Sequence, residues 1–169
     1  MYVTRHMEPV VLEVSSQYPA LLIVGPRQVG KTTMLEHLIE IEGRGRTVVT
    51  LDDLTERELA KTDPKMFPYI KMMVDQRHQP GDFWMTGSQL FKMMEGVQES
   101  LAGRVALLHL SPMSQSEILH CPATGPFRVD LNALQKRQQH CQICDTPTMY
   151  QRIFRGGMPA LVTGQYTNA

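Results

Sequence analysis

The sequence predicts an α/β fold in three layers, with helices on both faces of a parallel sheet. Two observations predict it. Short apolar or β-branched runs alternate with segments of helical periodicity along most of the chain, and crossovers of that kind join parallel strands. The run Ala20–Val24 has no polar position, which is typical of a strand buried on both faces.

Each predicted element rests on its periodicity and on the residues that end it. Glycines stop the helices, and a proline–glycine turn precedes one strand, because these residues break regular structure. Pro64 and Pro68 are expected to separate two helices. The predicted elements are, in order, helix 7–14, strand 20–24, helix 32–41, strand 47–51, helices 56–61 and 69–77, strand 83–86, helix 90–101 and a strand within 104–110.

The pattern changes after residue 119. Prolines, glutamines and histidines with weak periodicity occupy residues 121–148, and short helices are expected over 130–139 and near 150–154. We therefore predict a domain over residues 1–119. Residues 120–169 are predicted to be an irregular tail, made of a linker and the start of an incomplete C-terminal region.

Composition excludes several classes of protein. The 169 residues are 42% hydrophobic and 20% charged, which suits one packed domain rather than a disordered chain. Lys+Arg and Asp+Glu are both 17, so net charge gives no indication of a nucleic-acid partner. No apolar run is long enough for a membrane span and no secretory signal is visible. Three cysteines fit a reducing cytoplasm, where we expect the protein.

The segment after the first strand carries the strongest chemical signal. Gly25 to Thr32 matches G-x-x-x-x-G-K-[ST], the Walker A phosphate loop, between a buried strand and an amphipathic helix. Its glycines let backbone N–H groups point at phosphate oxygens, and the helix adds its positive end. We expect Lys31 to reach the β- and γ-phosphates and Thr32 to bind Mg²⁺. The predicted binding residues are Gly25, Pro26, Arg27, Gln28, Val29, Gly30, Lys31, Thr32 and Thr33.

Hydrolysis of a nucleotide also needs a carboxylate at the end of a strand. Asp52 and Asp53 follow the strand 47–51, so either could hold the metal. The alternative is that they form a turn and cap the next helix.

Three further side chains are candidates for contacts with the phosphates. Thr86 and Ser88 end a strand and could contact the γ-phosphate or the attacking water, whereas Ser88 could instead cap a helix. Arg104 could sense phosphate in its own or a neighbouring subunit, or be an ordinary surface arginine. Cys141 and Cys144 form a C-x-x-C that could bind zinc with the nearby histidines, but free thiols are the favoured interpretation.

Four phrases of the chain together resemble prokaryotic AAA-like ATP-binding proteins, in which an N-terminal ATPase domain precedes a C-terminal domain of unknown function. The phrases are ALLIVGPRQVGKTT, VVTLDDLTERELAKTDPKMF, FWMTGSQLFKMMEGVQESLAGRVALLHLSPMSQSEI and FRGGMPAL. The resemblance implies a P-loop sheet of strand order 5-1-4-3-2, with ATP and Mg²⁺ as ligands. It carries over Lys31 and Thr32, matches Thr86 to Ser88 with the polar sensor segment, and allows for a homo-oligomer.

One departure from that family changes the functional expectation. In similar proteins a strand ending in Asp-Glu, the Walker B element, lies between a DPKMF-like and a PYIK-like phrase. Here Met66-Phe67 runs directly into Pro68-Tyr69, so the sheet is predicted to lack one strand, and Asp52-Asp53 match an earlier, non-catalytic strand. We expect a shortened copy that binds ATP but hydrolyses it weakly or not at all. The alternatives are a small-molecule or nucleotide kinase that uses Asp52 or Asp53, and a non-catalytic interaction module or degenerate fragment.

Overall fold

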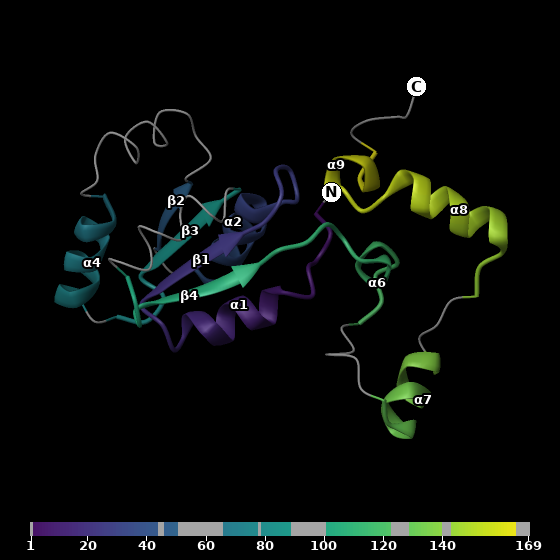
Figure 1. The fold of residues 1–169 in the computed structure, drawn as a ribbon, viewed down its shortest axis with the longest axis horizontal. Helices are drawn as coiled ribbons and strands as arrows, with labels where there is room; N and C mark the ends of the chain where they lie inside the picture. Colours follow the sequence, from purple (N-terminus) through teal and green to yellow (C-terminus); the bar gives the residue numbers. More distant parts are fainter. Residues whose placement is uncertain are drawn as a thin grey trace. The chain divides into compact units, whose positions relative to one another are not determined.

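Two compact units make up the chain in the computed structural model, and each is described by itself (Figure 1). One unit is Met7–Ser111; the other combines Met1–His6 with Pro112–Ala169. The structure describes residues 2–43, 46–50, 66–77, 79–88, 101–122, 129–139 and 143–164. The predicted boundary after residue 119 stays a prediction.

The first unit is built on a four-stranded parallel sheet of order β2-β3-β1-β4, which confirms the predicted fold class. β1 and β3 lie in the interior and are fully buried, whereas β4 at one edge is half exposed. The strands are β1 (Ala20–Val24), β2 (Thr47–Thr50), β3 (Phe83–Gly87) and β4 (Val105–His109).

The strand order differs from the one that the resemblance implies in a single respect. Removing the third strand from the order 5-1-4-3-2 leaves 5-1-4-2, and this is the observed order once the strands are renumbered along the chain. β2 pairs directly with β3, with Thr47 opposite Phe83 and Thr50 opposite Thr86. A strand therefore cannot lie between them, because neighbouring strands in a sheet are only about 4.8 Å apart.

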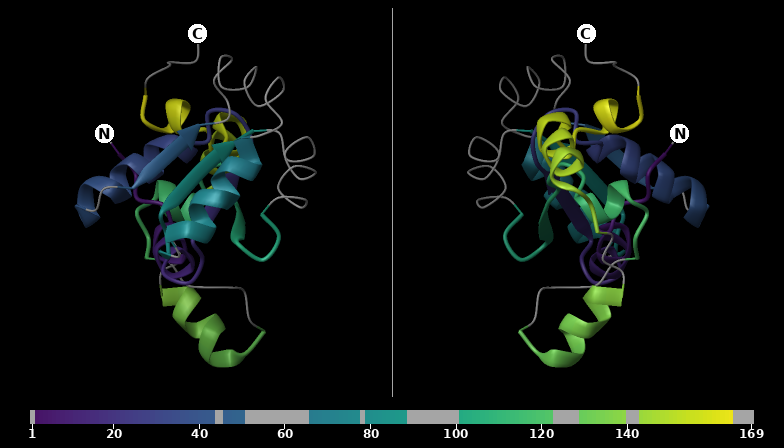
Figure 2. Two further views of the ribbon diagram at one scale, coloured as in Figure 1. Left: turned by 90° about the vertical axis from the view of Figure 1, so that its left-hand side faces the viewer. Right: turned by 90° about the vertical axis from the view of Figure 1, so that its right-hand side faces the viewer.

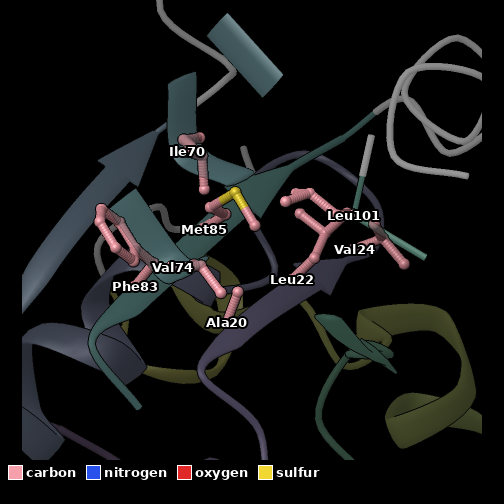
Figure 3. Packing of buried hydrophobic residues seen from close by; sticks show 8 residues of the cluster. All are labelled: Ala20, Leu22, Val24, Ile70, Val74, Phe83, Met85 and Leu101. Carbon is pink, nitrogen blue, oxygen red and sulfur yellow. The ribbon is translucent and has the colours of Figure 1, made fainter. Parts of the chain in front are cut away.

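Helices cover both faces of this sheet (Figure 2). On one face, Ile70 and Val74 of α4 pack against alternate residues of β1 and β3 (Figure 3). On the other face, α1 meets the sheet through Ser15, whose hydroxyl accepts a hydrogen bond from Trp84 of β3, and α2 contacts β3. The helices are α1 (Glu8–Ser15), α2 (Lys31–Glu42) and α4 (Met66–Arg77).

One helix begins earlier than the sequence pattern predicts. Residues 69–77 were expected to form a helix that starts after Pro68, but α4 begins at Met66. Pro68 thus lies in the first turn, where the backbone N–H groups have no carbonyl partner within the helix and a proline removes nothing. The helices predicted over 56–61 and 90–101 lie outside the described residues, apart from Leu101 in the core.

Short helices make up most of the second unit that the structure describes. Glu117 of α6 anchors the N-terminal segment, since its carboxylate accepts hydrogen bonds from Arg5 Nε at 3.1 Å and from the His6 backbone N–H at 2.8 Å. The three helices that follow α6 contain no buried residue. The helices are α6 (Gln115–Ile118), α7 (Leu131–Gln139), α8 (Thr146–Arg155) and α9 (Pro159–Val162).

In the part of the chain that the structure describes, no helix combines the length and the apolar character that crossing a membrane requires.

Candidate functional site

The segment between β1 and α2 has the backbone geometry of a tight strand-to-helix loop. Gly25 has φ of 153°, and a Cβ there would lie 2.1 Å from the Leu110 carbonyl oxygen, so only glycine fits beside β4. Gly30 has φ of 87° and stands at the N-cap of α2 without a side chain to cap the helix. At the apex, Gln28 also adopts a positive φ, of 64°, which is uncommon for a residue with a Cβ.

Burial divides the loop into an exposed arch and a buried base. Pro26, Arg27 and Gln28 are exposed, whereas Val29 is fully buried and fastens the arch to the unit. The base therefore stays fixed while the arch faces solvent. This is the arrangement that an anion needs if backbone N–H groups are to surround it.

Lys31 turns back onto the loop that precedes it. Its Nζ donates hydrogen bonds to the carbonyl oxygens of Gly25, at 3.1 Å, and Pro26, at 3.0 Å, and the residue is only 5% exposed. An ammonium group at the N-terminus of a helix adds positive charge where the helix dipole is already positive. The position therefore favours an anion, and the lysine bonds to neutral carbonyls that an anion's oxygens can replace.

Thr32 and Thr86 are brought together from positions 54 residues apart. Their Oγ1 atoms lie 3.5 Å apart, and Thr86 is completely buried in β3. Thr32 is half-buried at the first turn of α2. A threonine hydroxyl is an oxygen donor of the kind that Mg²⁺ prefers, so Thr32 fits the role of a metal ligand beside the loop.

Ser88 lies one residue beyond the end of β3 and is half-buried. It is therefore at the carboxyl ends of the strands, as the loop is. Because β1 and β3 are parallel with Val24 opposite Gly87, Ser88 comes level with Gly25, where the loop begins. Thr33 is exposed on α2 and takes no part in the contacts described here. Thr86 and Ser88 are thus both placed near the loop.

Arg104 lies elsewhere. It precedes β4, whereas the loop follows the carboxyl ends of the strands, so the five residues of β4 separate the two by roughly 16 Å. Its guanidinium binds Asp75 of α4 through two hydrogen bonds, of 2.5 Å and 3.2 Å. The hydrogen bond to Asp75, and then the charge of that carboxylate, raise the pKa of Arg104 above its usual value. The structure does not bring Arg104 to the loop of its own chain.

Two of the sequence hypotheses fall largely on residues that the structure does not describe. Asp52 and Asp53 lie outside the described residues, as do His140 and Cys141. Cys144 is exposed, and within the described ranges no group of three or more His, Cys, Asp or Glu side chains is placed to hold a metal.

A polar cluster at the amino ends of the strands was not predicted. Trp84 Nε1 donates to Ser15 Oγ at 2.7 Å, and the Arg46 guanidinium lies 4.4 Å from the centre of the Trp84 ring. Arg46 also donates to Ser15 Oγ at 3.1 Å and to the Gly81 carbonyl at 2.7 Å, and it pairs with Glu42. The only signal in the sequence is the single tryptophan in an apolar strand, whose buried N–H must find an acceptor.

The fold and the loop define the class of the protein as an α/β protein with a P-loop NTPase-like fold. The family described as "AAA domain" matches residues 17–68 and 60–119, which together span more than half of the chain. The chain belongs to this AAA domain family.

Two curated mycobacterial proteins are similar to the same chain. They are the uncharacterized protein Mb2031c of Mycobacterium bovis and the uncharacterized protein Rv2008c of Mycobacterium tuberculosis. Each is 28% identical over 117 residues, which cover 59% of this chain and 26% of the relative. The chain therefore spans about a quarter of the length of the curated relatives it matches.

Proposed function

We propose that the protein binds ATP with Mg²⁺ at the loop of residues 25–33 and hydrolyses it slowly or not at all. The observation that carries the proposal is the start of α2. There Lys31, which is 5% exposed, directs its Nζ at the loop carbonyls, and Thr32 lies next to the buried Thr86. Membership of the AAA domain family supports a nucleotide as the anion.

The expectation of slow hydrolysis rests on the sheet. β2 and β3 are direct neighbours, so the sheet has no place for a separate strand bearing an Asp-Glu pair between them. The family match also falls into two segments that overlap at residues 60–68, and the expected position of the missing strand lies there. Both observations support an internal deletion.

The direct pairing of β2 with β3 makes the pair Asp52-Asp53 a candidate for the metal carboxylate. β2 now occupies the place beside β3 and ends at Thr50, so Asp52 is two residues further along the chain. We propose that Asp52 or Asp53 supplies the metal carboxylate. The second acid is aspartate rather than glutamate, and a side chain shorter by one methylene is poorly suited to reach the attacking water.

Titration calorimetry tests the binding proposal. We expect wild type to bind ATP more tightly with Mg²⁺ than without it, and Lys31→Ala to weaken binding by about 10- to 100-fold, because charged hydrogen bonds contribute about 1.5–3 kcal/mol. Lys71→Ala removes the same charge from α4, on the other face of the sheet, and serves as the matched control. Equal affinity of both variants for ATP would contradict the proposal, and a preference for GTP would contradict its choice of base.

Product analysis then separates hydrolysis from transfer. Slow release of inorganic phosphate is expected, at a rate far below that of intact P-loop ATPases and abolished in Lys31→Ala. Rapid turnover, or a phosphorylated acceptor in place of free phosphate, would contradict the expected outcome.

A further inference from the structure

We infer that Thr86 is a positioning residue, whose hydroxyl holds the hydroxyl of Thr32 in the orientation that binds Mg²⁺. This inference rests on the proposed binding of ATP with Mg²⁺ and assigns Thr86 a role through Thr32 rather than a contact with the phosphates. It starts from the contact between the two Oγ1 atoms, which lie 3.5 Å apart.

Burial makes the hydroxyl of Thr86 unusual in its strand. The preceding residues of β3, Phe83, Trp84 and Met85, are buried and apolar, and Thr86 is 0% exposed. Valine has nearly the same shape, and a buried hydroxyl without a partner costs about 1–3 kcal/mol. The hydroxyl therefore needs a partner, and the structure supplies Thr32.

The chemistry of a metal-bound hydroxyl gives that contact a direction. A threonine hydroxyl has one proton and two lone pairs. If Thr32 Oγ1 gives a lone pair to a cation, its proton must point away from the charge and toward an acceptor. Thr86 Oγ1 accepts it, and we expect the long 3.5 Å contact to shorten on loading, as functional hydrogen bonds of empty sites commonly do.

The direct pairing of β2 with β3 explains why a hydroxyl group orients Thr32. The residue level with Thr86 on the neighbouring strand β2 is Thr50, so the described strand ends around Thr86 carry hydroxyl groups rather than carboxylates. On the other side, the residue level with Thr86 is the apolar Ile23 of β1. Thr86 is therefore the buried polar group of the sheet that reaches the first turn of α2.

The experiment measures ATP affinity of the full chain with Mg²⁺ and with EDTA. Mg²⁺ should raise the ATP affinity of Thr86→Val by a factor about tenfold smaller than in wild type, because groups that orient a metal ligand typically contribute 10- to 100-fold. The affinity in EDTA should change less than twofold. Thr86→Ser keeps the hydroxyl and should restore the tightening. Melting curves establish that each variant is folded, and Thr86→Ala carries the same expectation as Thr86→Val.

A double-mutant cycle with Thr32→Val separates the inferred role from a direct phosphate contact. If Thr86 acts through Thr32, the double variant loses no more Mg²⁺-dependent affinity than Thr32→Val alone. Additive losses, or a Thr86→Val variant as tight as wild type, would overturn the inference while ATP binding by wild type still stands. If wild type fails to bind ATP, the proposed function and the inference fall together.

Discussion

The two ends of the central strands are built for different purposes. At their amino ends, Trp84, Ser15 and Arg46 join β3 to α1 and to the start of β2 through hydrogen bonds of 2.7 to 3.1 Å. At their carboxyl ends, Lys31 donates hydrogen bonds to two carbonyls of its own loop, and Thr32 and Thr86 stand 3.5 Å apart. The amino ends thus hold side chains that join one element to another, whereas the carboxyl ends hold the side chains where an anion is expected.

This difference implies that stability and binding can be changed separately. A substitution at the amino ends should lower the free energy of unfolding and leave the affinity of the folded protein for ATP alone. A substitution at the carboxyl ends should do the reverse.

The largest effect is expected from Trp84→Ala. The ring is fully buried, carries the Arg46 guanidinium on its face and donates to Ser15, so its removal should cost about 3–5 kcal/mol of stability. Urea unfolding followed by circular dichroism measures the loss. The affinity for ATP, measured at low temperature where the variant is folded, should match that of wild type. A large change in affinity would contradict the separation of stability from binding.

The next largest effect is a loss of stability in the other unit, outside the sheet, and it concerns Glu117. Burial raises the pKa of Glu117, but hydrogen bonds from Ser114 and His6, with the charge of Arg5, outweigh it and hold the pKa below 4.5. A lowered pKa means that the ionised group stabilises the fold above about pH 4.5, and that this contribution is lost as the pH falls through the folded pKa.

Glu117→Gln should therefore destabilise the unit that contains Arg5 by about 3 kcal/mol at pH 7, because the substitution removes the charge of a buried salt bridge. The substitution should also reduce the loss of stability of this unit as the pH falls. Hydrogen exchange of the backbone amides of α6, followed at pH 7 and at pH 4, measures both. Exchange rates in β1 and β3 that rise as much as those in α6 would contradict the expected local effect.

A smaller loss of stability is expected from Ser15→Ala. Its hydroxyl oxygen accepts from both Trp84 Nε1 and Arg46, so its removal leaves two buried donors short of an acceptor, at a cost of about 1–3 kcal/mol. Ser16→Ala removes an exposed neighbouring hydroxyl and is the matched control. Thermal unfolding of the two variants should differ clearly, and equal melting temperatures would show that the cluster adds little.

The smallest expected effect, about tenfold, is a gain in rate. Asp53→Glu gives the chain the Asp-Glu order of the Walker B element three residues after the end of β2, and one added methylene extends the reach of the carboxylate. Phosphate release with saturating ATP and Mg²⁺ should rise, with ATP affinity unchanged. Glu36→Asp, on the exposed side of α2, is a control for the change of acid length.

Local features of the fold were predictable because local residues decide them. β1 begins after Pro19 and ends before Gly25, and the structure places it over the predicted residues 20–24. The helix after the loop differs by one residue at each end, since Lys31 and Glu42 extend it. The start of α4 was wrong because the tolerance of a first helical turn for proline was not considered.

Non-local features were not predictable in the same way. The sequence suggested that a strand was missing, but it gave no sign of whether the gap would stay open or close with β2 against β3. The placement of Thr86 beside the loop followed from the shared direction of parallel strands. The hypothesis that Arg104 senses phosphate in its own subunit, one of the alternatives left open, did not consider that this residue precedes its strand. The direction of a strand decides which end of it a residue occupies, and that rule assigns Arg104 to the far end.

The bonds of Lys31 also bear on which anions the loop accepts. Its ammonium group donates to two carbonyl oxygens, those of Gly25 and Pro26. An incoming anion must replace these carbonyl oxygens, and charged oxygens form hydrogen bonds roughly twice as strong as neutral ones. A single small anion can replace these carbonyls at Lys31 but reaches few of the backbone amides, whereas a polyphosphate chain can meet the lysine and several amides at once. The pairing of Lys31 with its own loop should therefore favour polyphosphates over chloride.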